Sequence, residues 1–222
     1  MSMGDELGGA PGPKRGRPRP FTLIVIAVNL GLALIAVVIP SVRNLCLMDP
    51  SAVWHGQVWR VFTHAWVHQG IVHALGNMAA FLPFAMYIEY RWGRARLATA
   101  YLLGCLGSGA FLLITGQRAL GASGAVAALM MLWLASVLCP KGKRWYVLGP
   151  EITLGVLVGV FYIAKMVLWD ITHLLADDQI SHWGHIGGFL TGYGLFRLNL
   201  LPASRSHPGA AQSGPLGTDP AP

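Results

Sequence analysis

Four polar residues that lie in apolar surroundings have types and spacings that suit covalent catalysis. Ser123 lies in the tetrapeptide GASG at residues 121–124, and His185 lies near the start of the last apolar run. A serine hydroxyl becomes an effective nucleophile when a base takes its proton, and neutral imidazole, with an ordinary pKa of about 6.5, suits that task near neutral pH. Ser123 and His185 are therefore a candidate dyad for acyl transfer.

The other two polar residues, His73 and Asn77, are four positions apart and share a face if this segment is helical. A tetrahedral intermediate needs hydrogen-bond donors at its developing oxyanion, and losing one such donor costs about 3–4 kcal/mol. His73, Asn77 and the backbone N–H of Ser123 are the candidate donors. The glycines at positions 121 and 124 leave room for a substrate backbone.

Each feature also has a structural interpretation. Ser123 can be a small packing residue, and a histidine or asparagine inside a membrane can hydrogen-bond a neighbouring helix. The cluster of His64, His68 and His73 permits a metal site, although no carboxylate or thiolate lies among these histidines. A carboxylate beside His185 would turn the dyad into a triad. The candidates are the loop residues Asp170, Asp177 and Asp178, which are more simply explained as solvated side chains.

The composition indicates whether these residues belong to a soluble protein or to a membrane protein. Of the 222 residues, 54% are hydrophobic and 11% are charged, against about 25% charged in soluble domains. The three cysteines, Cys46, Cys105 and Cys139, have no CxxC spacing and predict no disulfide framework. The composition excludes a disordered chain, a disulfide-stapled secreted module and an ordinary cytosolic enzyme, and it predicts an integral membrane protein.

Six apolar runs are each about as long as a helix needs to cross a bilayer. They predict an all-α, polytopic membrane domain over residues 21–201, with disordered, cytoplasmic Gly- and Pro-rich tails at 1–20 and 202–222. The predicted spans are Phe21–Pro40, Ile71–Tyr90, Leu97–Thr115, Gly121–Cys139, Val147–Trp169 and His182–Leu200.

The net charge is +7, and almost all the cations flank the apolar runs. This placement favours a role in orienting the helices over nucleic-acid binding. With the N-terminus in the cytoplasm, twelve cations fall on the cytoplasmic side: Lys14, Arg15, Arg17, Arg19, Arg91, Arg94, Arg96, Lys141, Lys143, Arg144, Arg197 and Arg205. Three fall on the other side: Arg43, Arg60 and Arg118. This orientation puts the four polar residues at one depth, near the outer face.

Two further patterns concern packing. Gly184, Gly188 and Gly192 recur every four residues along the last span, so they predict close contact with a neighbouring helix, for which the start of the fourth span is the natural partner. The connection at residues 41–70 contains several tryptophans and few cations, which predicts that it lies on the outer leaflet.

These residues together resemble the rhomboid intramembrane serine proteases. The resemblance covers Trp59 to Gly192 and rests on the order and spacing of several motifs. They are Trp59-Arg60, His64 and His68, the HxxxN pair His73 and Asn77, Glu89, the GASG segment with Gly121, Ser123 and Gly124, and the HxxGxxxG pattern of His185, Gly188 and Gly192.

The resemblance implies that Ser123 is the nucleophile and His185 the general base, with His73, Asn77 and the Ser123 amide at the oxyanion. It implies a six-helix bundle that cleaves single-pass membrane proteins near the outer face and needs no metal or organic cofactor. A bacterial cytoplasmic membrane fits the compact core. Many family members have an aromatic residue at position 127, behind the histidine, where this chain has Ala127. This departure raises three alternatives: slow turnover, support of His185 by another side chain such as Trp183, or an inactive scaffold that binds transmembrane helices.

Overall fold

The computed structural model describes residues 20–138 and 182–198, together with residues 160–161, 164, 167–168 and 171. Outside the described residues lie residues 1–19 of the predicted N-terminal tail, the whole predicted C-terminal tail, most of the predicted fifth span and the three loop aspartates, Asp170, Asp177 and Asp178. The last residue of the predicted N-terminal tail, Pro20, instead begins helix α1 (Pro20–Val38). The predicted count of six crossings therefore stays a prediction. Within the described ranges the regular elements are all helices, as the apolar runs predict.

Five long helices confirm the other five predicted apolar runs. Three of them, α1, α5 and α6, are long and apolar enough to cross a membrane, and α7 is a shorter apolar helix. Their bounds agree with the predicted runs within a few residues: α1 is Pro20–Val38, α5 is Ile71–Trp92, α6 is Arg94–Thr115, α7 is Ser123–Leu138 and α9 is His182–Arg197.

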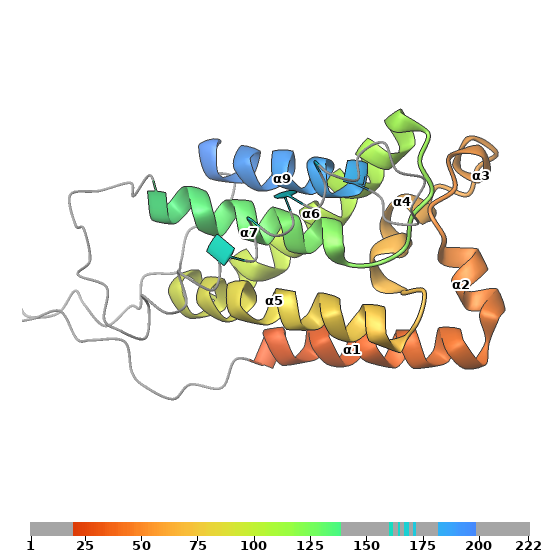
Figure 1. The fold of residues 1–222 in the computed structure, drawn as a ribbon, viewed down its shortest axis with the longest axis horizontal. Coiled ribbons are helices and arrows are strands. Elements are labelled where there is room, and N and C mark those ends of the chain that lie inside the picture. Colours follow the sequence, from red (N-terminus) through yellow and green to blue (C-terminus); the bar gives the residue numbers. More distant parts are fainter. Residues whose placement is uncertain are drawn as a thin grey trace, which may run out of the picture.

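Helix α7 occupies the centre of the bundle. It packs against α5, α6 and α9, while α1 lies along the far side of α5 (Figure 1). Residues on all sides of α7 are buried, among them Val126, Leu129, Met130 and Trp133. A helix that is apolar all round belongs in the interior of a bundle, so the first residue of α7, Ser123, is fixed at one end of the core.

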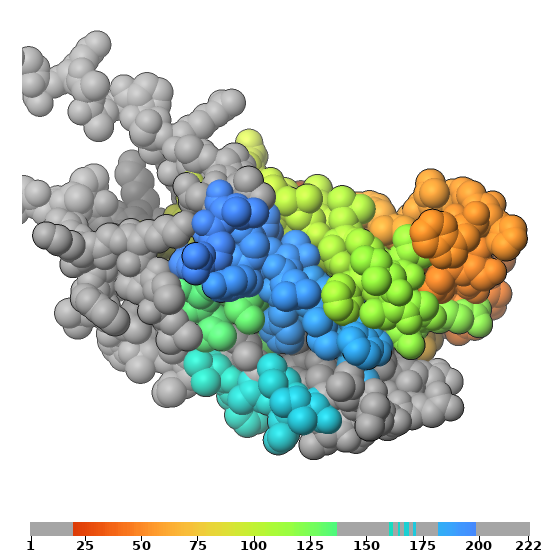
Figure 2. Space-filling view, turned by 90° about the horizontal axis from the view of Figure 1, so that it is seen from above, coloured from red at the N-terminus to blue at the C-terminus, as the bar shows by residue number. Residues whose placement is uncertain are grey.

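Small residues let α7 and α9 touch backbone to backbone. A Cβ on Gly188 would overlap the carbonyl of Gly124, and a Cβ on Gly192 would overlap the carbonyl of Ala128. The predicted pairing of the last span with the start of the fourth is thereby confirmed. The contact also brings the first turns of the two helices together. Figure 2 shows α9 lying on the face of the bundle beside α6.

The connection between α1 and α5 folds into short helices at one end of the bundle (Figure 1). They are α2 (Pro40–Cys46), α3 (Pro50–Trp54), α4 (Arg60–Thr63) and the 3-10 helix η1 (His64–Trp66). Trp54 and Trp59 are exposed, as an interfacial segment requires. Trp66 instead turns inward and packs edge-on against Tyr101 of α6, with ring centroids 5.2 Å apart.

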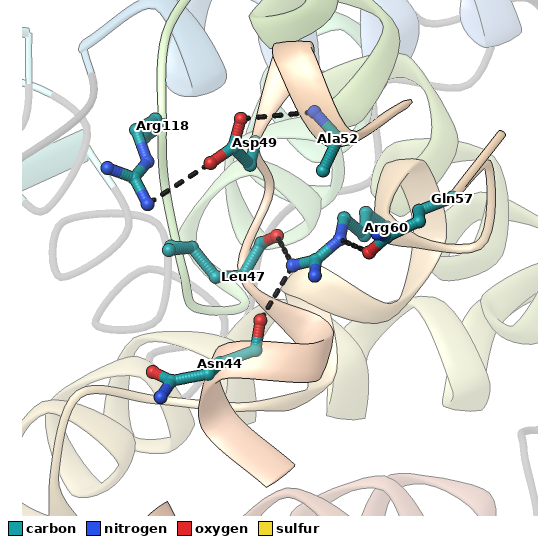
Figure 3. Close-up of polar contacts among 7 residues, drawn as sticks. All are labelled: Asn44, Leu47, Asp49, Ala52, Gln57, Arg60 and Arg118. Carbon is teal, nitrogen blue, oxygen red and sulfur yellow. Dashed lines mark hydrogen bonds and ion pairs between the residues drawn. The ribbon is translucent and has the colours of Figure 1, made fainter. Parts of the chain in front are cut away.

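The Trp59-Arg60 pair holds this connection together. The guanidinium of Arg60 donates to the carbonyls of Asn44 and Leu47 at 2.7 and 2.6 Å, and its Nε donates to Gln57 at 2.8 Å (Figure 3). The indole of Trp59 donates to the carbonyl of Leu45 at 3.2 Å. The two residues therefore donate hydrogen bonds to carbonyls at the C-terminal end of α2, which have no partner within this seven-residue helix.

Glu89, near the C-terminal end of α5, caps the N-terminus of helix α1. Its carboxylate accepts hydrogen bonds from the backbone N–H groups of Phe21 and Thr22 at 3.2 and 2.9 Å and from the Thr22 hydroxyl at 2.6 Å. A negative charge at the start of a helix meets its unpaired N–H groups and the positive end of its dipole. Glu89 thereby ties α1 to α5.

The hydroxyl contact gives a testable stability difference. Thr22→Val is expected to lower the free energy of unfolding by about 1–3 kcal/mol, since a buried carboxylate loses one of its charge-assisted donors. Thr22→Ser keeps the hydroxyl and is expected to stay close to the parent. Denaturant titration followed by tryptophan fluorescence measures both. Equal stability of the valine and serine variants would show that the hydroxyl does not stabilise α1.

Candidate functional site

The structure brings Ser123 and His185 to the same end of the bundle on helices that touch. Ser123 is the first residue of α7 and is partly exposed, whereas His185 lies in the first turn of α9 with 6% of its surface exposed. Their neighbours are in contact, because a Cβ on Gly124 would lie 2.9 Å from the carbonyl oxygen of Gly184. The two candidate reacting groups therefore begin adjacent helices at one depth.

His73 and Asn77 lie on the first two turns of α5 and meet the same region. His73 Nε2 and Asn77 Nδ2 are each 3.2 Å from the point that a Cβ on Gly121 would occupy. Asn77 is buried, and its Nδ2 has no hydrogen-bond partner within the described part of the chain. His73 is also near enough to His185 for their ring charges to interact. Two side-chain nitrogens thus converge on one point two residues before Ser123.

Position 121 suits glycine for two reasons. Its φ of +120° lies in a region that residues with a Cβ rarely adopt. A Cβ there would also meet the His73 ring, at 2.9 Å from Cε1. A residue with a side chain at position 121 would therefore displace the His73 ring or the Asn77 amide, so the glycine lets both side chains approach the chain just before Ser123.

Hydrogen bonds from the segment before α5 fix the approach to Ser123. The N–H of Gly121 donates to the carbonyl of His64 at 2.9 Å, and the N–H of Ala122 donates to Nε2 of His68 at 3.2 Å. The His68 and His73 rings lie edge to face with centroids 5.2 Å apart. The sequence gives only the spacing of these histidines, so it did not reveal that His68 contacts the backbone before the serine.

The histidine cluster is engaged in contacts with the protein. His64 Nδ1 lies 3.2 Å from the carbonyl of Arg60, and the lone pair of His68 Nε2 accepts the Ala122 N–H. Within the described ranges, no group of three His, Cys, Asp or Glu side chains is arranged to hold a metal ion. The metal interpretation of His64, His68 and His73 therefore has no geometric support in the described structure.

The surroundings of His185 differ from the sequence expectation in one respect. Trp183 packs against Phe111 of α6, with ring centroids 6.2 Å apart, and joins a buried cluster with Met48 and Leu112. Two residues along a helix correspond to a rotation of about 200°, so Trp183 faces away from His185, and the expected support from it is wrong. The His182 ring lies edge to face with His185 instead, at 6.5 Å between centroids.

Ala127 is fully buried where the helices approach most closely. Its Cβ lies 3.0 Å from the point that a Cβ on Gly188 would occupy. An aromatic side chain at position 127 would not fit between α7 and α9 in this packing. A further residue that sequence reasoning missed is Ser108 of α6, which fills the space against Gly124 and Gly184 beside the two candidate reacting residues.

Comparison with known proteins agrees with this architecture. The family model for the rhomboid domain matches residues 55–200. The chain is 27% identical over 171 residues to RHOMBOID-like protein 5 of Arabidopsis thaliana, covering 74% of this chain and 52% of that protein. The chain thus spans about half the length of that relative.

Two further relatives differ in what their names say of activity. The chain is 23% identical over 159 residues to Rhomboid-like protease 3 of Toxoplasma gondii, covering 70% of this chain and 58% of that protein. It is 25% identical over 160 residues to Inactive RHOMBOID-like protein 8 of Arabidopsis thaliana, covering 69% and 43%. The apolar helices and these matches identify an integral, multi-pass membrane protein, and the chain belongs to the rhomboid family.

Proposed function

We propose that this chain is an intramembrane serine endopeptidase that uses Ser123 and His185 as a dyad. The observation that carries the proposal is the convergence of His73 Nε2 and Asn77 Nδ2 on one point at Gly121, beside the contacting first turns of α7 and α9. A packing role for these polar side chains would not require a buried amide nitrogen to lie without a hydrogen-bond partner close to a serine.

The proposed reaction proceeds by acyl transfer. The Ser123 oxygen attacks the carbonyl carbon of the scissile peptide bond while its proton passes to the imidazole of His185. The carbonyl oxygen becomes an oxyanion, which His73, Asn77 and the Ser123 N–H stabilise. As the C–N bond breaks, His185 gives the proton to the leaving amine, and water then hydrolyses the serine ester by the same steps in reverse.

The substrate class follows from the depth of the site. Ser123 and His73 begin apolar helices, so a peptide must enter from within or just outside the bilayer, and single-pass transmembrane proteins whose helices unwind near that face are the proposed substrates. The lysine and arginine distribution puts both termini in the cytoplasm and the site toward the outer face, with a bacterial cytoplasmic membrane as the proposed location. The chemistry requires no metal or organic cofactor.

A fluorophosphonate, which reacts covalently with activated serines, tests the proposal. The purified protein in lipid vesicles is expected to take up a single label, which mass spectrometry locates on Ser123. Incubation with a single-pass protein whose transmembrane helix unwinds easily is expected to give two fragments. Both results depend on an activated hydroxyl rather than on helix binding.

The second candidate is a scaffold that binds transmembrane helices without cutting them. Ala127 favours it, because the aromatic residue that backs the histidine in many rhomboids is missing, and one relative is named inactive. Co-purification of a substrate helix, with no label on Ser123 and no fragments, would support the scaffold and reject the protease.

A further inference from the structure

The segment that leads into Ser123 is held from the side by the connection between α1 and α5. Met48 and Ala119 exchange two backbone hydrogen bonds, with N–O distances of 3.0 and 3.4 Å. Beside them, Arg118 forms an ion pair with Asp49 at 3.1 Å (Figure 3). Met48 is fully buried. This part of the segment therefore has a fixed position against α3 before the chain reaches the site.

The last contact before the serine comes from a side chain. Ala122 donates its N–H to Nε2 of His68 at 3.2 Å, and its carbonyl accepts the N–H of Val126 at 2.9 Å in the first turn of α7. Because peptide units are planar, these two bonds fix both planes that flank Ala122. The second plane carries the N–H of Ser123. His68 therefore contributes to the direction in which the Ser123 N–H points.

The hydrogen bond defines the protonation state of His68. Since Nε2 accepts an N–H, it carries no proton, and the proton of the neutral ring is on Nδ1. His68 is 1% exposed, and Nδ1 has no partner among the residues that the structure describes. Burial, together with a smaller effect of the neighbouring His73 of α5, lowers the pKa of His68 to about 4. The ring therefore stays neutral near pH 7.

We propose that His68 is a positioning residue, whose unprotonated Nε2 holds the Gly121–Ala122 peptide unit and so helps to aim the N–H of Ser123, in the next peptide unit, at the oxyanion. The inference rests on the proposed protease function. Removing the acceptor would leave the buried N–H of Ala122 unpaired, and the peptide would turn toward another partner. Protonation of the ring has the same effect, because Nε2–H would then face the N–H of Ala122.

Two substitutions separate the acceptor from the rest of the side chain. His68→Ala removes the acceptor, so the rate of fluorophosphonate labelling and kcat are expected to fall about 10- to 100-fold, the range for an unpaired buried donor, with KM unchanged. His68→Gln offers an amide oxygen at a similar reach and is expected to restore both rates to within about fivefold of the parent. His55→Ala, at an exposed histidine of the same connection, is the matched control and should label at the parental rate.

The pH dependence of the labelling rate distinguishes a positioning role of His68 from a purely structural one. Protonation of His68 can slow labelling only in the parent, because His68→Gln has no titratable group at this position, whereas every other effect of acid is shared by the two proteins. The pKa of His68 is lowered to about 4, so this loss of labelling is centred near pH 4 rather than near pH 6.5. The labelling ratio of His68→Gln to parent is expected to rise about twofold by pH 4, under conditions where tryptophan fluorescence shows both proteins folded.

The outcomes distinguish this inference from the proposed function. If the parent takes no label on Ser123, the protease proposal fails. If the parent is labelled but His68→Ala labels as fast, or His68→Gln labels no faster than His68→Ala, the positioning role is rejected and the protease proposal stands. A labelling ratio that stays constant between pH 7 and pH 4 rejects the protonation effect. Should His68→Ala not fold, His68→Gln and the pH series still decide.

Discussion

Ser123→Ala and His185→Ala are each expected to lower kcat for cleavage at least about 1,000-fold, and the double variant is expected to lose no more than either single variant. The reason is that the two groups act in one proton transfer: without the base the hydroxyl is a poor nucleophile, and without the hydroxyl the base has no proton to take. Cleavage of a single-pass substrate in vesicles, followed with time, measures all three variants.

The control is a serine elsewhere on the same helix. Ser136 donates its hydroxyl to the carbonyl of Trp133 within α7, so Ser136→Ala removes a hydroxyl from the helix without touching the site and should retain parental activity. Each variant must also show parental thermal unfolding. If the losses of Ser123→Ala and His185→Ala multiply in the double variant, the residues act independently and the dyad is wrong.

The helices were predictable because membrane-crossing segments have a simple physical requirement. A run of about 20 apolar residues satisfies its backbone internally and spans the hydrocarbon layer. The run Ile71–Tyr90 accordingly predicted α5, which is Ile71–Trp92, and Leu97–Thr115 predicted most of α6, which is Arg94–Thr115. The charged residues at the helix ends account for the small differences in the boundaries.

The pairing of α7 with α9 was predictable for a related reason. Glycines every four residues leave a flat strip along a helix, and Gly188 and Gly192 meet Gly124 and Ala128 there. The sequence did not reveal that the neighbouring strip of α9 also packs closely, with Gly187 against Phe111 of α6. The spacing of glycines predicts that one face of the helix packs closely. Which face meets which neighbouring helix depends on how the whole bundle is arranged.

In the candidate site, too, some features could be predicted from local sequence patterns and others could not. The positions of Ser123, His185, His73 and Asn77 at the starts of apolar runs predicted that these residues meet at one end of the bundle. The chemistry that their residue types indicate, and their depth below the outer face, stay predictions. The contacts of His68 with Ala122 and of Trp183 with Phe111 join segments far apart in the chain. No local pattern encodes such contacts, which is why the first was missed and the second was expected on the wrong side of α9.

Gly188→Ala is expected to lower the free energy of unfolding by about 1–3 kcal/mol, the cost of an overpacked core, and to lower kcat about 100-fold or more. A methyl group at this position would overlap the carbonyl of Gly124, which is backbone and cannot rotate away. The helices must therefore separate where Ser123 and His185 begin them. A shift of about 1 Å between reacting groups is enough for a loss of this size.

Gly194→Ala is the matched control on the same helix. A Cβ on Gly194 meets nothing within 4 Å, so the alanine should leave activity unchanged and stabilise the helix by up to about 1 kcal/mol through its better helix propensity. Chemical denaturation and the cleavage assay together compare the two variants. Parental activity in Gly188→Ala, with the variant folded, would mean that the close approach of α7 and α9 does not set the distance between the nucleophile and its base. A loss of activity in both variants would point to general sensitivity of α9 rather than to its contact with α7.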